Sequence, residues 1–189
     1  MKKDLGKICS VFPMPVLMVA AYDENGKVNV MNAAWGMNSA MDKITLFIGE
    51  RHKTTANIRV SNAFTVAIAD RAHVVEADYV GIASGNDVPD KFERTGLHAV
   101  KSAHVNAPII EEFPLTFECE LEQIIDTDTY HAVVGNVVNL CADEKVIGEN
   151  GKVDPLKVDA ILFDQFQAGY YTIGEKVGQA WSSGKELMK

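Results

Sequence analysis

The chain has 189 residues, of which 47% are hydrophobic and 23% are charged, a composition typical of an ordinary folded protein. We expect one domain over residues 1–189, long enough to bury about 70% of the surface of its unfolded chain. The formal net charge of −8 argues against a general nucleic-acid-binding protein, because such proteins need a basic face.

Cysteine use and the N-terminal apolar run indicate the compartment. Cys9, Cys119 and Cys141 are odd in number and widely spaced, which favours free thiols over disulfides or a zinc site. The apolar run Val11–Tyr22 contains two prolines and is shorter than the about 20 residues that span a bilayer. We therefore read it as a first strand, not a signal peptide or membrane anchor, and expect a cytoplasmic protein without a membrane partner.

The first predicted elements form a β-hairpin. Val16–Tyr22 is a nearly continuous apolar strand, and Asp23–Gly26 ends in Asn-Gly, a pair that tolerates the positive φ angles of tight hairpin turns. Lys27–Met31 returns as the second strand. It delivers the small-residue patch Asn32–Trp35 to the end of that strand.

Two strands and two helices are predicted next. Thr45–Ile48 and Phe64–Ala69 are strands, and the second is apolar enough to be buried on both faces. Thr54–Val60 can form a helix that lies on the sheet. Ala72–Ala83 has apolar residues at helical spacing before a Ser-Gly stop, and Asp87–Thr95 is polar and loop-like.

The C-terminal half is also rich in strands. Thr116–Ile125 alternates, which predicts an apolar face and a wet face that carries Glu118, Glu120 and Glu122. No sustained alternation of strands and helices occurs, so the predicted class is all-β, a barrel with added helices. The remaining elements are the strands Tyr130–Cys141 and Val158–Phe166 and an amphipathic terminal segment, Val177–Lys189.

The segment between residues 30 and 58 holds the candidate ligand site. Asn32, Ala33 and Ala34 are small enough for backbone amides to approach a flat ligand, and Trp35 offers an aromatic surface. Arg51-His52-Lys53-Thr54-Thr55 then gathers donors before a predicted helix, where free N–H groups and the helix dipole favour an anion. A planar ring with a phosphate tail would suit both ends. From the residues alone, a hairpin followed by a solvated basic turn is an equal alternative.

The order of these motifs resembles the flavin reductase-like, FMN-binding split-barrel family, which includes flavoredoxins. The motifs that carry the resemblance run in family order from about residue 10 to about residue 142. They are Asn-Ala-Ala-Trp at 32–35, Glu-Arg-His-Lys-Thr-Thr at 50–55, Ser84-Gly85 with Asp90-Lys91-Phe92, Ala107–Glu111, Phe117-Glu118-Cys119, and His131 before Val134–Val137. The resemblance implies a split β-barrel of Greek-key topology, and a homodimer with FMN near its interface.

The resemblance also implies roles for individual residues. The cofactor-binding set would be Asn32, Ala33, Ala34, Trp35, Arg51, His52, Thr54, Thr55 and Lys91, and no metal is implied. His131 would be the catalytic residue, placed to contact a nicotinamide donor or to steady charge on the reduced ring. By default, Lys91 would be a solvated surface lysine and His131 a strand-end histidine bonded to a loop.

The implied activity is that of a flavin-dependent oxidoreductase that passes electrons from NAD(P)H or a reduced carrier protein, through bound FMN, to an acceptor. A non-catalytic barrel that binds FMN or a nucleotide, as a flavin store or an electron carrier only, is the alternative, and pyridoxamine-phosphate oxidase-like chemistry is a third. Many family members have a Pro-Pro pair where this chain has Met41-Asp42-Lys43. That difference leaves the electron donor open.

Overall fold

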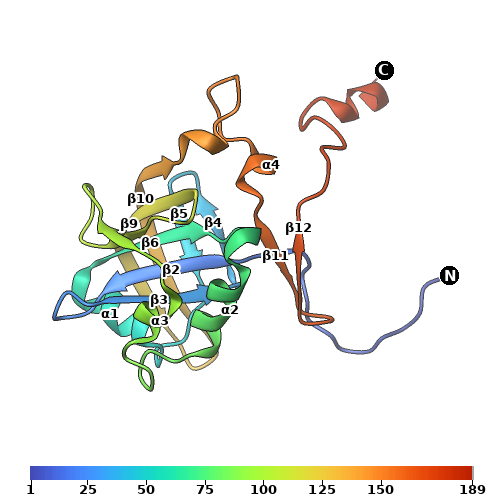
Figure 1. The fold of residues 1–189 in the computed structure, drawn as a ribbon. Coiled ribbons are helices and arrows are strands. Elements are labelled where there is room, and N and C mark those ends of the chain that lie inside the picture. The colour runs from blue at the N-terminus through green and yellow to red at the C-terminus, as the bar shows by residue number, and fades with distance from the viewer. Residues whose placement is uncertain (189) are drawn as a thin grey trace.

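The computed structural model describes residues 1–188 and is built around one curled antiparallel sheet (Figure 1). The predicted all-β class with added helices is confirmed. The seven strands of this sheet are β2 (Leu17–Tyr22), β3 (Val28–Ala33), β4 (Gly36–Ala40), β5 (Lys43–Leu46), β6 (Ala63–Ile68), β9 (Leu115–Asp126) and β10 (His131–Ala142).

The sheet closes on itself at the link between β3 and β4. The strand order is β3-β2-β6-β9-β10-β5-β4, so β3 and β4 are its two opposite edges. Only Ala34 and Trp35 separate them in the chain, and each residue spans at most about 3.6 Å. The two edges must therefore lie side by side, and the sheet forms a barrel that is split at this link.

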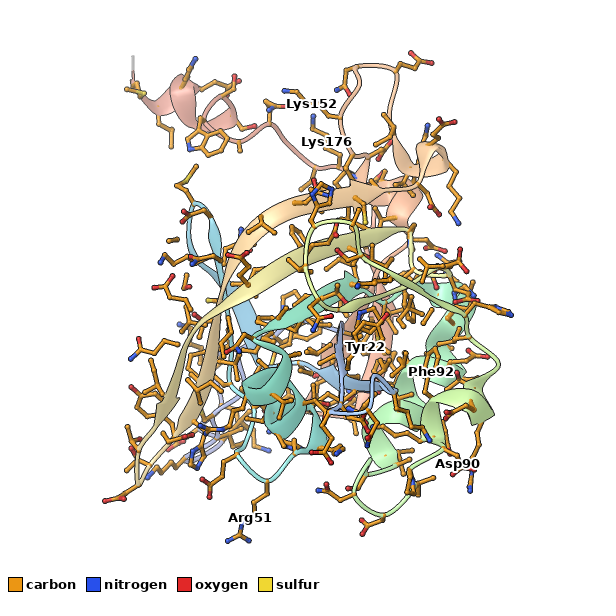
Figure 2. The ribbon with its side chains drawn as sticks, turned by 90° about the vertical axis from the view of Figure 1, so that its left-hand side faces the viewer. Tyr22, Arg51, Asp90, Phe92, Lys152 and Lys176 are labelled. Atoms are coloured by element: carbon orange, nitrogen blue, oxygen red, sulfur yellow. The ribbon has the colours of Figure 1, made fainter. Side chains whose placement is uncertain are left out.

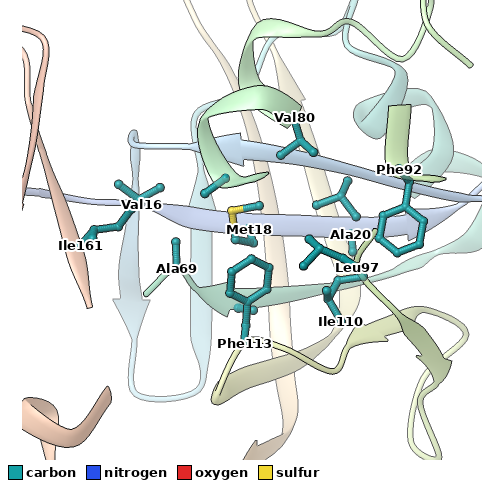
Figure 3. Packing of buried hydrophobic residues seen from close by; sticks show 13 residues of the cluster. Val16, Met18, Ala20, Ala69, Val80, Phe92, Leu97, Ile110, Phe113 and Ile161 are labelled. Carbon is teal, nitrogen blue, oxygen red and sulfur yellow. The ribbon is translucent and has the colours of Figure 1, made fainter. Parts of the chain in front are cut away.

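Strand β2 is buried on both faces because the barrel encloses one face and helices cover the other. Leu17, Val19 and Ala21 point into the barrel core, whereas Met18 and Ala20 belong to a second cluster outside it. Figure 3 shows this second cluster. It includes Val16, Ala69, Val80, Phe92, Leu97, Ile110, Phe113 and Ile161.

Helices fill the spaces around the barrel. The two predicted helices are present, the second of them preceded by a 3₁₀ turn at Arg71–His73. The segment Asp87–Thr95, predicted to be a loop, contains a short helix instead. Its side chains Lys91 and Phe92 are buried, and this tertiary burial overrides the polar local sequence. The helices are α1 (Lys53–Ser61), α2 (Val74–Ile82), α3 (Lys91–Thr95) and α4 (Pro155–Val158).

A separate small sheet forms an arm beside the barrel (Figure 1). It comprises β1 (Met14–Pro15), β11 (Ile161–Asp164) and β12 (Gly169–Thr172), in the order β1-β11-β12. After β12 the chain leads away from the barrel to a 3₁₀ helix at Ser183–Met188, and Lys189 of the predicted terminal segment lies outside the described residues. The other elements are the hairpin β7 (Ala99–Lys101) and β8 (Pro108–Ile110), and a 3₁₀ turn at Glu144–Val146.

The predicted wet face of β9 is wrong at one position. Glu118 is 1% exposed, and its carboxylate accepts hydrogen bonds from the side chains of Ser102 and Asn139. Glu120 is exposed and Glu122 pairs with Lys43, as expected of surface carboxylates. Glu118 is enclosed because the loop after β7 folds over this end of the strand, which alternation along one strand cannot indicate.

Two further observations concern membrane-spanning helices and the thiols. Within residues 1–188, every helix is too short or too polar to cross a bilayer. The three cysteines are free, as predicted, and burial beside Glu118 raises the pKa of Cys119 to about 12.

Candidate functional site

A pocket of about 270 Å³ opens at the split in the barrel. Asn32, Ala33, Ala34 and Trp35 all line it, so the patch predicted from the sequence is brought together. The other lining residues come from the link between β1 and β2, from β3, the segment after β5, helix α2 and the arm; they are Val16, Met31, Phe47, Ile48, His52, Gly81, Phe163 and Tyr170.

Helix α2 packs closely against the end of β3. The side-chain amide of Asn32 donates a hydrogen bond of 2.8 Å to the Ala77 carbonyl. Gly81 lies opposite the same side chain, and a Cβ atom there would come within 2.2 Å of the Asn32 Oδ1 atom. A glycine at this position therefore allows the helix to form one side of the pocket.

Aromatic residues form another part of the lining. Trp35 and Phe163 lie with ring centroids 6.5 Å apart, and Phe163 lies 6.0 Å from Tyr170. The Tyr170 hydroxyl donates a hydrogen bond to Asp78 of α2, and burial together with this carboxylate raises the pKa of Tyr170 to about 12. The arm is thus tied to α2 beside the pocket. Phe163 and Tyr170 were not among the predicted site residues.

A second, smaller pocket of about 100 Å³ adjoins the first, and Met31, His52 and Gly81 line both. It lies at the beginning of α1. Lys53 and Thr54 line it from α1, and Lys91 lines it from α3. The adjacent end of α2 supplies Val80–Ile82, followed by Ala83, Ser84 and Gly85, and Asn29 of β3 completes the lining.

Lys91 is the main electrostatic feature of this smaller pocket. Its side chain is 3% exposed, and Nζ donates hydrogen bonds of 2.9 Å to the carbonyls of Val80 and Ala83 at the end of α2. Burial lowers the pKa of Lys91 to about 8. Among residues 1–188, no carboxylate forms an ion pair with it. An anion in the pocket would supply the missing counter-charge.

The predicted donor cluster at residues 51–55 divides between the pockets and their surroundings. Thr54 Oγ1 accepts a hydrogen bond of 2.7 Å from the amide of Asn29, and Thr55 Oγ1 donates one of 2.8 Å to the Gly49 carbonyl. His52 precedes the first residue of α1, and burial and the Lys91 charge lower its pKa. Thr55 is buried behind the pocket and does not line it.

Arg51 lies outside both pockets. Its side chain is exposed and projects away from the barrel (Figure 2). Its backbone carbonyl accepts a hydrogen bond of 2.9 Å from the Asn86 side chain, which holds the turn in place. The structure does not bring its guanidinium to the small pocket, and its expected role as a phosphate ligand stays a prediction.

His131 begins β10 and also lies outside the residues that line the two pockets. Its Nδ1 atom is 3.0 Å from an Asp126 carboxylate oxygen, and Asp126 also binds Arg59. The hydrogen bond from Arg59, and to a smaller extent that from His131, lowers the pKa of Asp126. The adjacent Tyr130 ring packs 6.4 Å from Phe47, which does line the larger pocket. The catalytic role of His131 stays a prediction.

Comparison with known proteins decides the family. The family model described as "Flavin reductase like domain" matches residues 9–162. The chain belongs to this family. The flavin reductase-like chain is 34% identical to the flavoredoxin of Desulfovibrio vulgaris (Miyazaki F), with a TM-score of 0.92 over 97% of this chain and 100% of that one.

Other relatives of this flavin reductase-like chain agree in fold. The flavoredoxin from Methanosarcina acetivorans is 26% identical, with a TM-score of 0.88 over 100% of both chains. An uncharacterised Bacillus subtilis protein, YwrF, is 33% identical over 76% of this chain and 77% of its own length. The split-barrel fold implied by the sequence resemblance is confirmed.

Proposed function

We propose that this protein is an FMN-dependent oxidoreductase of the flavoredoxin and flavin reductase type. Electrons would enter from NAD(P)H or a reduced carrier protein and leave, through bound FMN, to an acceptor. Family membership and the flavoredoxin similarity over nearly the whole chain support the cofactor. The observation that carries the proposal is a buried lysine that has no carboxylate partner among residues 1–188, next to a pocket lined by small and aromatic residues.

The residues present fit a flat ring with a phosphate tail. Ala33, Ala34 and Gly81 leave room for a planar group, and Trp35 and Phe163 offer aromatic surfaces to it. The adjoining small pocket would take the phosphate, because two lysines, Lys91 and Lys53, line it. The N-terminus of α1, with its unpaired backbone N–H groups, also lies there.

When bound, a flavin supplies the hydride and single-electron chemistry, so the protein's residues bind and orient it and control access. His52 lies between the two pockets, and its lowered pKa favours the neutral imidazole, which can donate or accept a hydrogen bond. Tyr170 keeps its proton at physiological pH because its pKa is about 12. Both groups therefore present neutral polar atoms rather than charge to the ring.

The rim of the larger pocket determines which partners reach the ring. Trp35 is 51% exposed and Phe47 is 48% exposed, so one side of the pocket is open to solvent in this chain alone. An open side is needed for a donor or acceptor to approach. It also fits the alternative function, an FMN store without turnover, because storage requires the same pocket.

We also propose a symmetric homodimer, the commonest form of oligomer, formed by a single-domain chain in the cytoplasm. The half-exposed aromatic rim supports a dimer, since a second subunit would cover it. Light scattering on the purified protein measures this directly. A mass of 20.7 kDa at micromolar concentration, the mass of one chain, would contradict the dimer.

The purified protein should be yellow and should bind added FMN without a covalent bond. Anaerobic reduction by NADH, NADPH and a reduced ferredoxin, compared side by side, separates the functions. Rapid reduction by one donor, with turnover when an acceptor is added, supports the oxidoreductase. Bound FMN that none of these donors reduces supports the store, and colourless protein that does not bind FMN would contradict both.

A further inference from the structure

The C-terminal segment, residues 173–188, lies wholly on the surface of this chain. Each of its residues is exposed, and so is Tyr171 before it. Among the described residues, its hydrogen bonds are all made within the segment itself, as between Ser183 and Gln179. Its large apolar side chains are Ile173, Val177, Trp181, Leu187 and Met188, and the last four are each at least 84% exposed.

Such a segment does not hold its shape without a partner surface. Its one regular element is a six-residue 3₁₀ helix, and short isolated helices are marginal in water. The match with the Methanosarcina acetivorans flavoredoxin covers all of this chain, and therefore includes the segment. A segment with this much exposed apolar surface, which among the described residues forms no hydrogen bond with its own barrel, indicates a surface supplied from outside the chain.

The rim of the larger pocket is a surface of the right kind. Trp35 and Phe47 are half-exposed and adjacent, because the Phe47 amide donates a hydrogen bond of 2.8 Å to the Trp35 carbonyl. Met37, on the neighbouring edge strand β4, is 68% exposed. The face is apolar and lies at the edge strand beside the split, and exposed apolar patches of this kind mark interaction surfaces.

We propose that the C-terminal segment of a second copy of this chain covers the rim formed by Trp35, Met37 and Phe47 and closes the FMN pocket. The inference rests on the proposed function, since it assumes the dimer and the FMN pocket. The exchange is reciprocal: each subunit gives its segment and receives the other, as two-fold symmetry requires. Trp181 is the largest side chain available to cover the aromatic rim.

Charge is compatible with a second copy as the occupant. Two chains that each carry −8 repel at long range, so a contact between them must avoid acidic surface. The segment is balanced, with Glu175 and Glu186 against Lys176 and Lys185, and the rim residues carry no charge. Apolar burial can therefore drive this contact without bringing like charges together.

The consequence is a cofactor site that is complete only in the dimer. The barrel would hold the ring and the phosphate, and the partner's segment would exclude water from the open side. The segment should then affect FMN affinity and dimer formation together, although it does not line either pocket within its own chain.

Trp181 emission tests the contact without using FMN. The chain has two tryptophans, so the difference between the emission of the wild type and that of Trp181→Phe isolates Trp181 and leaves the rim intact. We expect emission at short wavelength in the concentrated dimer and a shift to long wavelength as dilution releases monomers. Long-wavelength emission from a protein that is still dimeric would overturn the proposal, and so would a protein that is monomeric at every concentration.

Mixed dimers then test whether the segment acts on its partner. One variant carries Val177→Asp and Leu187→Asp in the segment, and the other carries Ala34→Trp, which fills the pocket. Neither alone should bind FMN tightly, whereas a mixture should regain binding, because the intact barrel of the first variant receives the intact segment of the second. Lys185→Ala is the matched control, since it changes the segment without removing apolar surface.

The outcomes separate this inference from the proposed function. Weak FMN binding by the segment variant that mixing does not restore would mean that the segment acts on its own barrel. FMN binding and dimer mass unaffected by the two aspartates would mean that the segment covers nothing. Wild type that does not bind FMN would contradict the proposed function, while the Trp181 emission would still test the exchange.

Discussion

The hydroxyl of Tyr170 donates a hydrogen bond of 2.7 Å to a carboxylate oxygen of Asp78, which ties the arm to helix α2 beside the larger pocket. Tyr170→Phe should lower the free energy of unfolding by about 1–2 kcal/mol, because a partly buried carboxylate loses its donor. Chemical denaturation measures the change. Tyr171→Phe is the matched control, since Tyr171 is 45% exposed, and an equal loss there would contradict the interpretation.

The Tyr170–Asp78 pair also predicts that the free energy of unfolding depends on pH in the alkaline range. The pKa of Tyr170 is about 12 in the folded protein against a model value of 10.0. Between these values the unfolded chain loses the phenol proton and the folded chain keeps it, so the free energy of unfolding falls as pH rises through this window. Tyr170→Phe should lack this part of the fall.

Lys91 predicts that FMN affinity depends on pH. Burial lowers its pKa from 10.5 to about 8, so the free protein loses this positive charge as pH rises above 8. The FMN phosphate stays fully charged there, since its second pKa is about 6. We expect FMN to bind progressively more weakly as pH rises from about 7 to about 9.5, and riboflavin, which has no phosphate, to change little. Parallel pH profiles for the two ligands would contradict the assignment.

Comparing Lys91→Met with Arg51→Ala locates the phosphate anchor. Loss of a charge-assisted contact at Lys91 should weaken FMN binding about ten- to a hundredfold and leave riboflavin binding nearly unchanged. Arg51→Ala should have a small effect, because its side chain projects into solvent (Figure 2). An equal or larger effect at Arg51 would place the anchor at the turn that the sequence first suggested.

Gly81 and Asn32 should be coupled. A Cβ atom at position 81 would lie 2.2 Å from Asn32 Oδ1, so Gly81→Ala should displace that amide, destabilise the protein by about 1–3 kcal/mol and weaken FMN binding. Adding Asn32→Ala removes the clash, so the double variant should be more stable than additivity predicts. Additive losses in a double-mutant cycle would show that the close approach does not matter.

His131→Ala tests the remaining catalytic prediction. Asp126 keeps its ion pair with Arg59 in this variant, so the fold should be little affected. If His131 positions a donor, rapid-mixing measurements should show slower flavin reduction at nearly unchanged FMN affinity. Unchanged reduction kinetics in the folded variant would remove His131 from the site.

Much of the fold follows from local rules in the sequence. The Asn25-Gly26 turn, the apolar β2 and β6, and the helix after residue 53 were all predictable, because each depends on neighbouring residues. Strand β4 was not, since its residues Met37–Ala40 are exposed and show no apolar alternation. It is a strand because β5 pairs with it and because the two-residue link places it at the barrel edge.

The candidate site divides in the same way. Asn32–Trp35 were identifiable because small residues before an aromatic occur together in the chain. Phe163 and Tyr170 are far away in sequence and reach the pocket only through the arm. For Lys91, composition indicates a surface residue, and its burial depends on the ends of α2 and α3 packing together. Arg51 shows the converse. Its position in the sequence predicted that it lies near the phosphate site, but the direction of its side chain depends on the conformation of the turn.

The split in the barrel links the cofactor to the lifetime of the protein. Ala34 and Trp35 both join the two sheet edges, which do not pair with each other, and line the pocket, so a bound ligand contacts the seam of the barrel. Ligand binding to the folded state alone raises the free energy of opening by mass action. A cell short of flavin would therefore contain more of the open form, and proteases would degrade the empty protein first.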